Sequence, residues 1–320
     1  MRYIRGCSND PYFNLASEQY YFDTKEEIFM LWINAPAVII GRNQNAVAEI
    51  DHDYVKENNI TVARRISGGG AVFHDLGNVN FTFLVNDSKF GDYSSFTKNL
   101  LAFLNENGCG AKLEGRNDLT VDGMKFSGMA QKIGKDRMMH HGCILFDANL
   151  DKLSGALRPD PEKIKSKGVQ SVRKRVTNLS EYLNMDTSEF FDRLEKWMIK
   201  AENLDVRPMT EEERCGIQKL RDEKFSTDEW IYGISPEYTF HKKARFNGGI
   251  FEVYLKVEHA IIKDCKIYGD FFSAFDVEEA QNALIGSLHL EDNVRTALNK
   301  IGADKMIQGI TLDEIMTVMF

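Results

Sequence analysis

Residues 117–128 constrain the fold of this chain more than any other segment, because they predict a β-hairpin from local signals alone. Asp122-Gly123 is a preferred dipeptide for a two-residue hairpin turn. With the turn there, the predicted cross-strand pairs are Val121 with Met124, Thr120 with Lys125, Leu119 with Phe126, and Asp118 with Ser127. One face then carries four apolar side chains, and the other carries the polar side chains of Asp118, Thr120, Lys125 and Ser127.

The polar face of this hairpin has two interpretations. Ordinary solvent surface is the usual one, since one face of an antiparallel hairpin is commonly wet. A chemical role is the other, because Lys125 lies diagonal to Asp118 and within side-chain reach of it. A lysine held beside a carboxylate suits contact with a phosphate or a carbonyl oxygen. The segment alone does not decide between these interpretations.

A second segment, Arg64–Asp75, joins two arginines, three consecutive glycines and a histidine. Gly68-Gly69-Gly70 permits backbone conformations closed to other residues and a close approach to a ligand. The alternative is a plain glycine-rich turn between two strands. In a strand through Ser67, Arg65 shares the face of Ser67 and Arg64 points away, so one arginine faces a phosphate or carboxylate.

The histidines and cysteines do not form a metal-site pattern. His140 and His141 are adjacent, so in a strand they point to opposite faces, and we expect at least one to be structural. His74 fits a solvent-exposed residue or a hydrogen-bonded loop anchor better than an acid–base catalyst. The five cysteines contain no CxxC pair, and their odd number favours a reducing compartment.

Length and composition indicate a globular protein of one large and one small domain. The 320 residues are 43% hydrophobic, and the net charge of −8 makes nonspecific binding to nucleic acid unexpected. The N-terminus lacks an apolar signal core, and the most apolar run, residues 28–40, is too short to span a bilayer. We therefore expect a soluble, cytoplasmic protein, with a monomer as the default.

Hydrophobic periodicity predicts the order of the elements. Helices are expected at 15–22, with Asn14 as N-cap, and at 94–106 and 188–200. Strands are expected at 28–33, 37–40, 60–67 and 79–85. A linker near 233–246 divides a domain of residues 1–240 from a domain of residues 246–320.

The C-terminal part reads as a small module of strands followed by helices. Phe251, Val253, Leu255 and Val257 alternate with more polar residues, which predicts a strand with one wet face. Asp276 with Glu279, and Thr311 with Glu314, have the spacing of capping boxes. Gly302 is expected to end the helix between those two starts.

A basic run interrupts this acidic sequence. It consists of Lys163, Lys165, Lys167, Arg173, Lys174 and Arg175. A solvated helix face or loop is the simpler interpretation, and a loop that closes over a polyphosphate is the alternative.

Several motifs together resemble the lipoate–protein ligase A family across essentially the whole chain. In order they are Gly41-Arg42-Asn43-Gln44-Asn45, the Arg64–Asp75 segment followed by Gly77-Asn78, Gly115-Arg116-Asn117-Asp118-Leu119, Lys125-Phe126-Ser127-Gly128, His140-His141-Gly142, and residues 167–179. The resemblance implies an α+β fold: a biotin/lipoate ligase-like catalytic domain, with a mixed, largely antiparallel sheet flanked by helices, and a small C-terminal α+β domain.

The resemblance also implies an activity. Lipoate is activated by ATP and Mg²⁺ to lipoyl-AMP with release of pyrophosphate, and the lipoyl group passes to one lysine of a lipoyl carrier domain. Such carriers are the E2 subunits of 2-oxoacid dehydrogenases and the glycine-cleavage H protein. The C-terminal domain argues for a ligase that performs both half-reactions, although it could instead bind the carrier, gate the site or require a partner protein.

Site residues follow from the same resemblance, position by position. Lys125 is the expected catalytic residue, in contact with both the acyl carbonyl and the phosphate. ATP or the adenylate is expected at Arg65, Gly70, Ala71, Val72, Phe73, Asn117, Asp118 and Lys125, with Asp118 near a magnesium ion. Lipoate is expected at Trp32, Ser67, Gly69, Gly70, His74, Lys125, Ser127 and His141. Residues 165–179 match a loop that orders over the adenylate.

Two positions depart from the family pattern and keep alternatives open. Ile66 stands where some relatives have serine, and Cys143 stands where many have a small polar residue. A related family on the same fold uses a cysteine thioester, so an ATP-independent octanoyl or lipoyl transferase is one alternative. A noncatalytic module that binds a lipoyl carrier is another. Biotin ligation is disfavoured because the glycine-arginine-glycine-arginine block of that family is absent.

Overall fold

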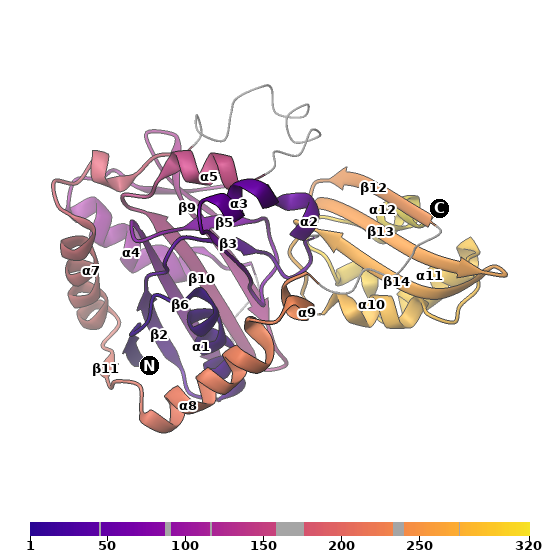
Figure 1. Ribbon diagram of the computed structural model, residues 1–320, viewed down its shortest axis with the longest axis horizontal. Helices are drawn as coiled ribbons and strands as arrows, with labels where there is room; N and C mark the ends of the chain where they lie inside the picture. Colours follow the sequence, from indigo (N-terminus) through magenta and orange to yellow (C-terminus); the bar gives the residue numbers. More distant parts are fainter. Residues whose placement is uncertain (45, 87–90, 116, 158–175, 233–239, 275) are drawn as a thin grey trace.

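A mixed eight-stranded sheet forms the centre of the larger domain in the computed structural model (Figure 1). The structure describes residues 1–44, 46–86, 91–115, 117–157, 176–232, 240–274 and 276–320. In spatial order the strands are β11 (Asp205–Val206), β1 (Arg2–Arg5), β2 (Ile28–Trp32), β6 (Asn78–Asn86), β10 (Arg137–Leu145), β9 (Met124–Ile133), β8 (Asp118–Val121) and β7 (Lys112–Glu114). The first three strands are parallel, and the remaining neighbours are antiparallel.

A second sheet positions the glycine-rich segment. Its order is β4 (Thr61–Arg64), β3 (Ala37–Ile40) and β5 (Val72–His74), with β3 parallel to β4 and antiparallel to β5. Because β4 and β5 flank β3, the chain from residue 65 to 71 must cross the end of β3, where Gly41 begins a turn.

Helices cover both faces of the large sheet, and the strands alternate between two apolar cores. Among the described residues, the α-helices of this domain are α1 (Pro11–Asp23), α2 (Ala46–Glu49), α3 (His52–Glu57), α4 (Ser94–Glu106), α5 (Leu150–Ala156), α7 (Thr187–Ala201), α8 (Glu211–Leu220) and α9 (Asp228–Ile231). In β2, Phe29 and Leu31 pack in the core beneath α4 and α7, whereas Ile28 and Met30 pack in the core beneath α1. This two-sided burial explains why β2 reads as a continuous apolar run.

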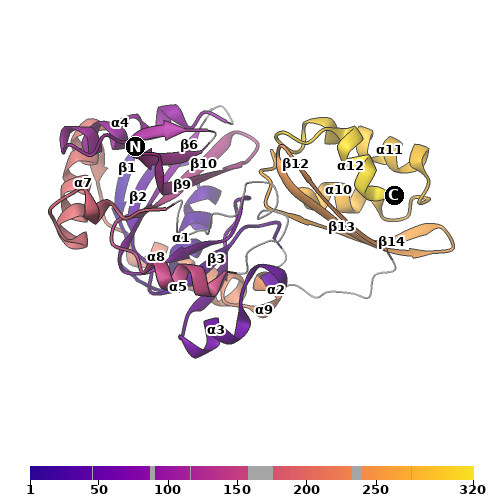
Figure 2. The same ribbon diagram turned by 90° about the horizontal axis from the view of Figure 1, so that it is seen from above.

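The C-terminal domain has the predicted strands-then-helices order. An antiparallel sheet of β12 (Phe240–Phe246), β13 (Gly249–Glu258) and β14 (Ile261–Gly269) is covered on one face by α10 (Val277–Leu284), α11 (Glu291–Lys300) and α12 (Leu312–Met319) (Figure 2). Phe251, Val253 and Leu255 are buried against these helices, as their alternation predicted. Gly302 has φ +69° just after α11, which confirms its place at that helix end.

Most predicted elements of the larger domain are confirmed, and two need correction. The helix at 94–106 is α4 with the same bounds, and β3 matches 37–40. Helix α1 begins at Pro11 rather than Leu15, because Asp10 is the N-cap and accepts from the backbone N–H of Tyr12. Asn14 lies inside the helix, so its prediction as N-cap is wrong. The strand predicted at 60–67 ends at Arg64.

The predicted linker is also too long. Residues 240–246 form β12, which pairs along its whole length with β13, while residues 233–239 lie outside the described residues. The Lys242-Lys243 pair suggested a break in the pattern, but an edge strand tolerates exposed lysines. The basic residues between 163 and 175, and the predicted adenylate loop up to residue 175, lie outside the described residues as well.

The two predicted capping boxes differ. Thr311 and Glu314 form the complete box, whereas the Asp276 side chain accepts from the backbone N–H of Glu278 and makes no box with Glu279. Both residues still begin their helices. Within the described ranges, we find no helix with the length and apolar character needed to cross a membrane.

Candidate active site

The predicted hairpin is formed by β8 and β9, and its turn has the expected geometry. Asp122 and Gly123 have φ +50° and +74°, the positive values that the favoured two-residue turn requires. The two pairs nearest the turn, Val121 with Met124 and Thr120 with Lys125, are as predicted. Local turn chemistry therefore determined the register here.

The outer half of the hairpin has a different register from the predicted one. A β-bulge makes Leu119 pair with Ser127 and Asp118 pair with Gly128, so the predicted pairs with Phe126 and Ser127 are wrong. Leu119 and Phe126 are both fully buried in the same core. The extra residue lies in β9 between Lys125 and Ser127, and Met129 beyond it is buried in the same core.

Lys125 and Asp118 form the ion pair that their diagonal relation suggested. Lys125 Nζ lies 2.7 Å from Asp118 Oδ1, and the two side chains are 39% and 40% exposed. An ion pair this exposed contributes about 1 kcal/mol or less to stability. A Cβ on Gly128 would come within 3.0 Å of Lys125 Nζ, so glycine leaves room for the ammonium group. The backbone N–H of Thr177 donates to the carbonyl of Lys125.

A cavity of about 170 Å³ lies between the glycine-rich segment and strands β9 and β10. It brings together most of the site residues predicted from the sequence, namely Trp32, Arg65, Gly69, Gly70, Ala71, Val72, His74, Asn117, Lys125 and His141. Four predicted residues do not line it: Ser67, Phe73, Asp118 and Ser127. Phe73 packs in a core beside β3, Ser127 is buried, and Asp118 stands beside Lys125 at the rim.

The two arginines point to different surroundings, although β4 ends at Arg64 and the predicted strand through Ser67 does not form. Arg65 is buried and donates to Ser67 Oγ and to the carbonyls of Ile39, Gly68 and Gly70. Burial lowers the pKa of Arg65 to about 10, so the guanidinium stays charged at neutral pH. Its donors hold the glycine-rich backbone in place. Arg64 donates instead to carbonyls of the Gly41–Gln44 turn and of Trp230 and Ile231.

The three glycines have different reasons to be glycine. A Cβ on Gly68 would come within 2.6 Å of the carbonyl oxygen of Phe271 in the C-terminal domain. Gly69 has φ +90°, donates its N–H to that carbonyl at 3.1 Å, and would bring a Cβ within 3.0 Å of the Phe272 ring. Gly70 has open space around it. Two glycines therefore serve the contact between the domains, and the third faces the cavity.

His74 and His140 are both buried and neutral. His74 accepts from the Asn34 side-chain amide at Nδ1, which leaves its proton on Nε2. His140 accepts from Gln131 and stacks on Phe96 at a centroid distance of 4.6 Å. Burial lowers the pKa of each histidine to about 3. His140 is therefore a core residue, in agreement with the expectation that at least one of the adjacent pair is structural.

Sequence reasoning missed Glu18. This fully buried residue of α1 accepts a hydrogen bond from His141 Nδ1 at 2.7 Å, and His141 Nε2 lies 2.6 Å from Ser67 Oγ. A signal was present, because positions 14, 17, 18 and 21 share one helical face and that face is polar yet buried. A polar face turned toward the core of a sheet domain indicates a hydrogen-bonded network.

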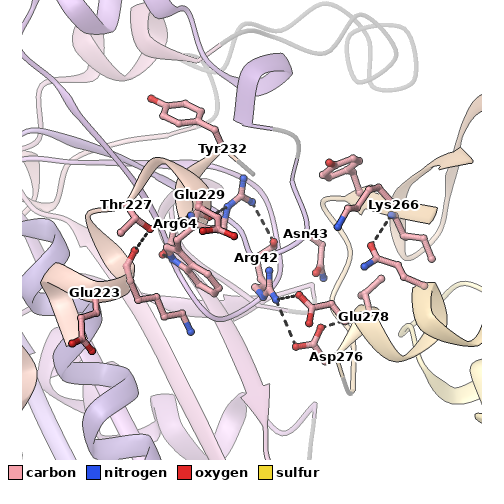
Figure 3. A pocket seen from close by; sticks show the side chains of 16 residues that line it. Arg42, Asn43, Arg64, Glu223, Thr227, Glu229, Tyr232, Lys266, Asp276 and Glu278 are labelled. Atoms are coloured by element: carbon pink, nitrogen blue, oxygen red, sulfur yellow. Dashed lines mark hydrogen bonds and ion pairs between the residues drawn. The ribbon is translucent and has the colours of Figure 1, made fainter. Parts of the chain in front are cut away.

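The C-terminal domain contributes directly to the surroundings of the site. Phe272 lines the cavity that contains Lys125. A second, larger cavity of about 440 Å³ lies between the domains, where Arg42 contacts Glu278 at 2.7 Å and Asp276 at 3.7 Å (Figure 3). Its lining mixes basic and acidic side chains, so it lacks the single sign of charge that an anion site needs.

Cys143 also lines the cavity that contains Lys125. Burial raises the pKa of its thiol, so the thiol stays protonated at neutral pH. A catalytic cysteine normally has the opposite shift. This environment fits an inert core residue of β10 better than a nucleophile.

Comparison with known proteins identifies the class of enzyme. Residues 10–199 match the lipoyl protein ligase A/B catalytic domain, and residues 235–319 match the bacterial lipoate protein ligase C-terminus. The lipoate-protein ligase LplJ of Bacillus subtilis is 37% identical over 322 residues, which cover 98% of this chain and 97% of the relative. The chain is thus a ligase-class enzyme. It belongs to the lipoate–protein ligase family, in the form with a C-terminal domain.

Solved structures share this fold. P. falciparum LipL1 in complex with lipoate has a TM-score of 0.80 at 24% identity, covering 99% of this chain and 97% of its own. A lipoate-protein ligase A bound with ATP has a TM-score of 0.62 at 28% identity, covering 73% and 99%. The bipartite lipoate protein ligase of Thermoplasma acidophilum, studied with its E2 lipoyl domain, has a TM-score of 0.63 at 29% identity, covering 75% and 98%.

Proposed function

We propose that this chain joins lipoate to a carrier lysine through lipoyl-AMP. A carboxylate oxygen of lipoate attacks the α-phosphorus of ATP, an acyl–phosphate bond forms, and pyrophosphate leaves. The ε-amine of the carrier lysine then attacks the acyl carbon, an amide forms, and AMP leaves. The observation that carries the proposal is the Lys125–Asp118 pair at the rim of a cavity whose opposite wall is the glycine-rich segment.

Lys125 is the residue that we assign to the chemistry. Its ammonium group is half-exposed at the rim and is anchored on a strand, so it can contact an acyl carbonyl and an α-phosphate together. Positive charge placed there stabilises the charge that develops in both half-reactions. No protein nucleophile is needed, because the substrate carboxylate and the carrier amine attack.

The walls of the cavity suit an acyl chain. Leu15, Trp32, Ile39, Val72 and Met129 supply apolar surface, and the Gly70–Val72 backbone closes one side. Arg65 would act through the loop, because its donors hold the carbonyls of Gly68 and Gly70. We assign Asn117 to the phosphate side of the cavity, where its amide donates to the carbonyl of Met129 at 2.5 Å and fixes the turn before β8.

Magnesium enters this scheme with the nucleotide. Within the described part of the chain, no group of three or more His, Cys, Asp or Glu side chains could hold a resident metal ion. Mg²⁺ bound to ATP takes most of its ligands from phosphates and water and needs only one or two carboxylates, of which Asp118 can supply one. The ion would neutralise phosphate charge as pyrophosphate leaves.

Carriers with a lipoyl domain are the expected acceptors. The Thermoplasma acidophilum ligase was studied with its E2 lipoyl domain, and we extend that class of acceptor to this chain. We expect E2 subunits of 2-oxoacid dehydrogenases and the glycine-cleavage H protein to be substrates.

The deciding experiment measures pyrophosphate release by the full-length chain with ATP and Mg²⁺, with and without lipoate, and without a carrier. We expect release only with lipoate, together with lipoyl-AMP detected by mass spectrometry. Lipoyl or octanoyl transfer to a carrier in the absence of ATP would contradict the proposal and favour the cysteine route. Cys143→Ala separates the two routes, since the proposed ligase keeps its activity in that variant.

A further inference from the structure

One buried carboxylate oxygen joins two walls of the cavity. Glu18 Oε1 accepts from Thr82 Oγ1 at 2.6 Å and from His141 Nδ1 at 2.7 Å. On one side, Trp32 Nε1 donates to Thr82 Oγ1 at 3.1 Å. On the other side, His141 Nε2 lies 2.6 Å from Ser67 Oγ. Two residues, Thr82 of β6 and His141 of β10, thus bond this oxygen directly, and through them Trp32 of β2 and Ser67 of the glycine-rich segment are connected to α1.

A chain of hydrogen bonds links Arg65 to Glu18 through Ser67 and His141, and it has a defined direction. A guanidinium nitrogen can only donate, so Arg65 Nε donates to Ser67 Oγ at 3.0 Å. The Ser67 hydroxyl can then donate its own proton to His141 Nε2. That bond requires His141 to carry its proton on Nδ1, and Glu18 accepts the hydrogen bond of this proton.

We propose that Glu18 is a positioning residue for the reaction, which holds His141 as the Nδ1–H tautomer and through Ser67 and Arg65 sets the place of the glycine-rich backbone. The inference rests on the function proposed above. Arg65 donates to the carbonyls of Gly68 and Gly70, so the orientation of Ser67 and Arg65 decides where this backbone stands opposite Lys125.

A purely structural role explains Glu18 poorly. The side chain is fully buried, and Oε2 has no hydrogen-bond partner among the described residues. A buried carboxylate with an unsatisfied oxygen destabilises a fold, and an apolar side chain of similar size would avoid that effect. The neighbouring buried Ser17 differs, because its hydroxyl is satisfied by the carbonyl of Phe13.

Ser67, His141 and Glu18 are connected in the same order as the serine, histidine and carboxylate of a hydrolase triad. Ser67 is nevertheless a poor nucleophile, since it is 1% exposed, does not line the cavity, and already accepts from Arg65. We therefore expect no acyl-serine on Ser67.

Two substitutions and one control test the proposal. Glu18→Leu removes the acceptor and keeps the volume, whereas Glu18→Gln keeps the volume and an amide oxygen that can accept from His141 Nδ1–H in place of Oε1. Ser17→Ala is the matched control on the same helix, because it removes a buried hydroxyl outside the network. The readouts are the ¹⁵N signals of the His141 ring, assigned with His141→Gln, and kcat/KM for lipoate in pyrophosphate release without a carrier.

We expect the wild-type His141 to carry its proton on Nδ1. Glu18→Leu should lose that tautomer and at least about tenfold in kcat/KM, as expected for misplaced binding groups, while Glu18→Gln keeps the tautomer and Ser17→Ala keeps both. A wild-type proton on Nε2 would overturn the proposal, and so would normal kcat/KM in a variant whose tautomer has changed. Detection of an acyl group on Ser67 would show covalent catalysis and would overturn the positioning role of Glu18. If the wild type releases no pyrophosphate, the proposed function fails. The tautomer measurements then still test whether Glu18 holds His141 as the Nδ1–H tautomer.

Discussion

The hairpin of β8 and β9 and the glycine-rich segment face each other across one cavity, but they obtain their shapes in different ways. The hairpin turn has positive φ at Asp122 and Gly123, and a Cβ on Gly123 would meet open space. The glycine-rich segment is held from within by the Arg65 guanidinium, which donates to the carbonyls of Gly68 and Gly70. From outside, Phe271 and Phe272 of the other domain lie against Gly68 and Gly69.

This difference shows that glycine can be required for two reasons. In the hairpin, glycine is needed for its own backbone angle. At Gly68 and Gly69, it is needed mainly because another chain segment comes too close for a side chain. A local requirement can be read from a dipeptide, whereas a requirement set by a neighbouring domain cannot.

The largest expected effect is a loss of activity on removal of the Lys125 ammonium group from the hairpin. Lys125→Ala should reduce lipoate-dependent pyrophosphate release by about 100-fold or more, because a positioned cation is lost from the reacting groups. The fold should remain intact, since this side chain is 39% exposed. Initial rates and thermal unfolding measure both effects, and Lys112→Ala on the exposed neighbouring strand β7 is the control. A Lys125→Ala variant that keeps most of its activity would contradict the assignment.

Acid should destabilise the protein through two buried histidines, His74 in the glycine-rich segment and His140 in β10 beside the hairpin. The pKa of His74 and of His140 is lowered to about 3 by burial, so between pH 6.5 and 3 the unfolded chain binds protons that the folded chain does not. Stability is therefore lost as pH falls, by about 1.4 kcal/mol per pH unit for each histidine.

His140→Phe tests this pH dependence, because phenylalanine can keep the stacking with Phe96 and cannot bind a proton. Urea unfolding at pH 7 and pH 5 should show that the variant loses about 2 kcal/mol less than the wild type over this interval. Parallel losses in the two proteins would show that His140 becomes protonated in the folded state.

A matched pair of glycine substitutions tests the two reasons for glycine directly. Gly123→Ala should cost about 1 kcal/mol, because only the positive φ is strained. Gly69→Ala should cost more, about 2–3 kcal/mol, because the new methyl group also meets the Phe272 ring. Denaturant unfolding gives both values. Phe272→Ala in combination with Gly69→Ala should recover part of the loss, and no recovery would mean that the φ angle and the contact with Arg65 Nη2 account for it.

The smallest expected effect is on the stability provided by the rim ion pair. Asp118→Asn should change the free energy of unfolding by less than about 1 kcal/mol, since both side chains are about 40% exposed. The same variant should still lower adenylation, because we assign the carboxylate to the nucleotide and its magnesium. If the loss of adenylation activity were fully explained by the loss of folded protein, Asp118 would serve the fold only.

Local signals predicted much of the fold but failed where distant parts meet. Helix α4, strand β3 and the inner half of the hairpin agree with the prediction because periodicity and turn chemistry act within a few residues. The bulge beside Phe126 was missed, because the alternation of apolar and polar residues gives no signal for an extra residue in one strand. β12 was missed because its lysines lie on an edge that becomes evident only when the sheet is formed.

The candidate site shows the same division. Ten of the predicted residues line one cavity, and the diagonal Lys125–Asp118 pair forms as expected. Glu18 and Phe272 were not singled out, since neither belongs to a motif, and each reaches the site from an element far away in the chain.

By itself, the sequence determined the hairpin turn, the register next to that turn, and the family through ordered motifs. Only the tertiary structure decided that Arg65 holds loop carbonyls, that two of three glycines accommodate the C-terminal domain, and that Glu18 joins two walls of the cavity. The physical reason is the separation along the chain of the groups that interact. Backbone angles and side-chain alternation are set by neighbouring residues, whereas burial, close approach and hydrogen-bond partners are set by segments that meet only in the folded chain.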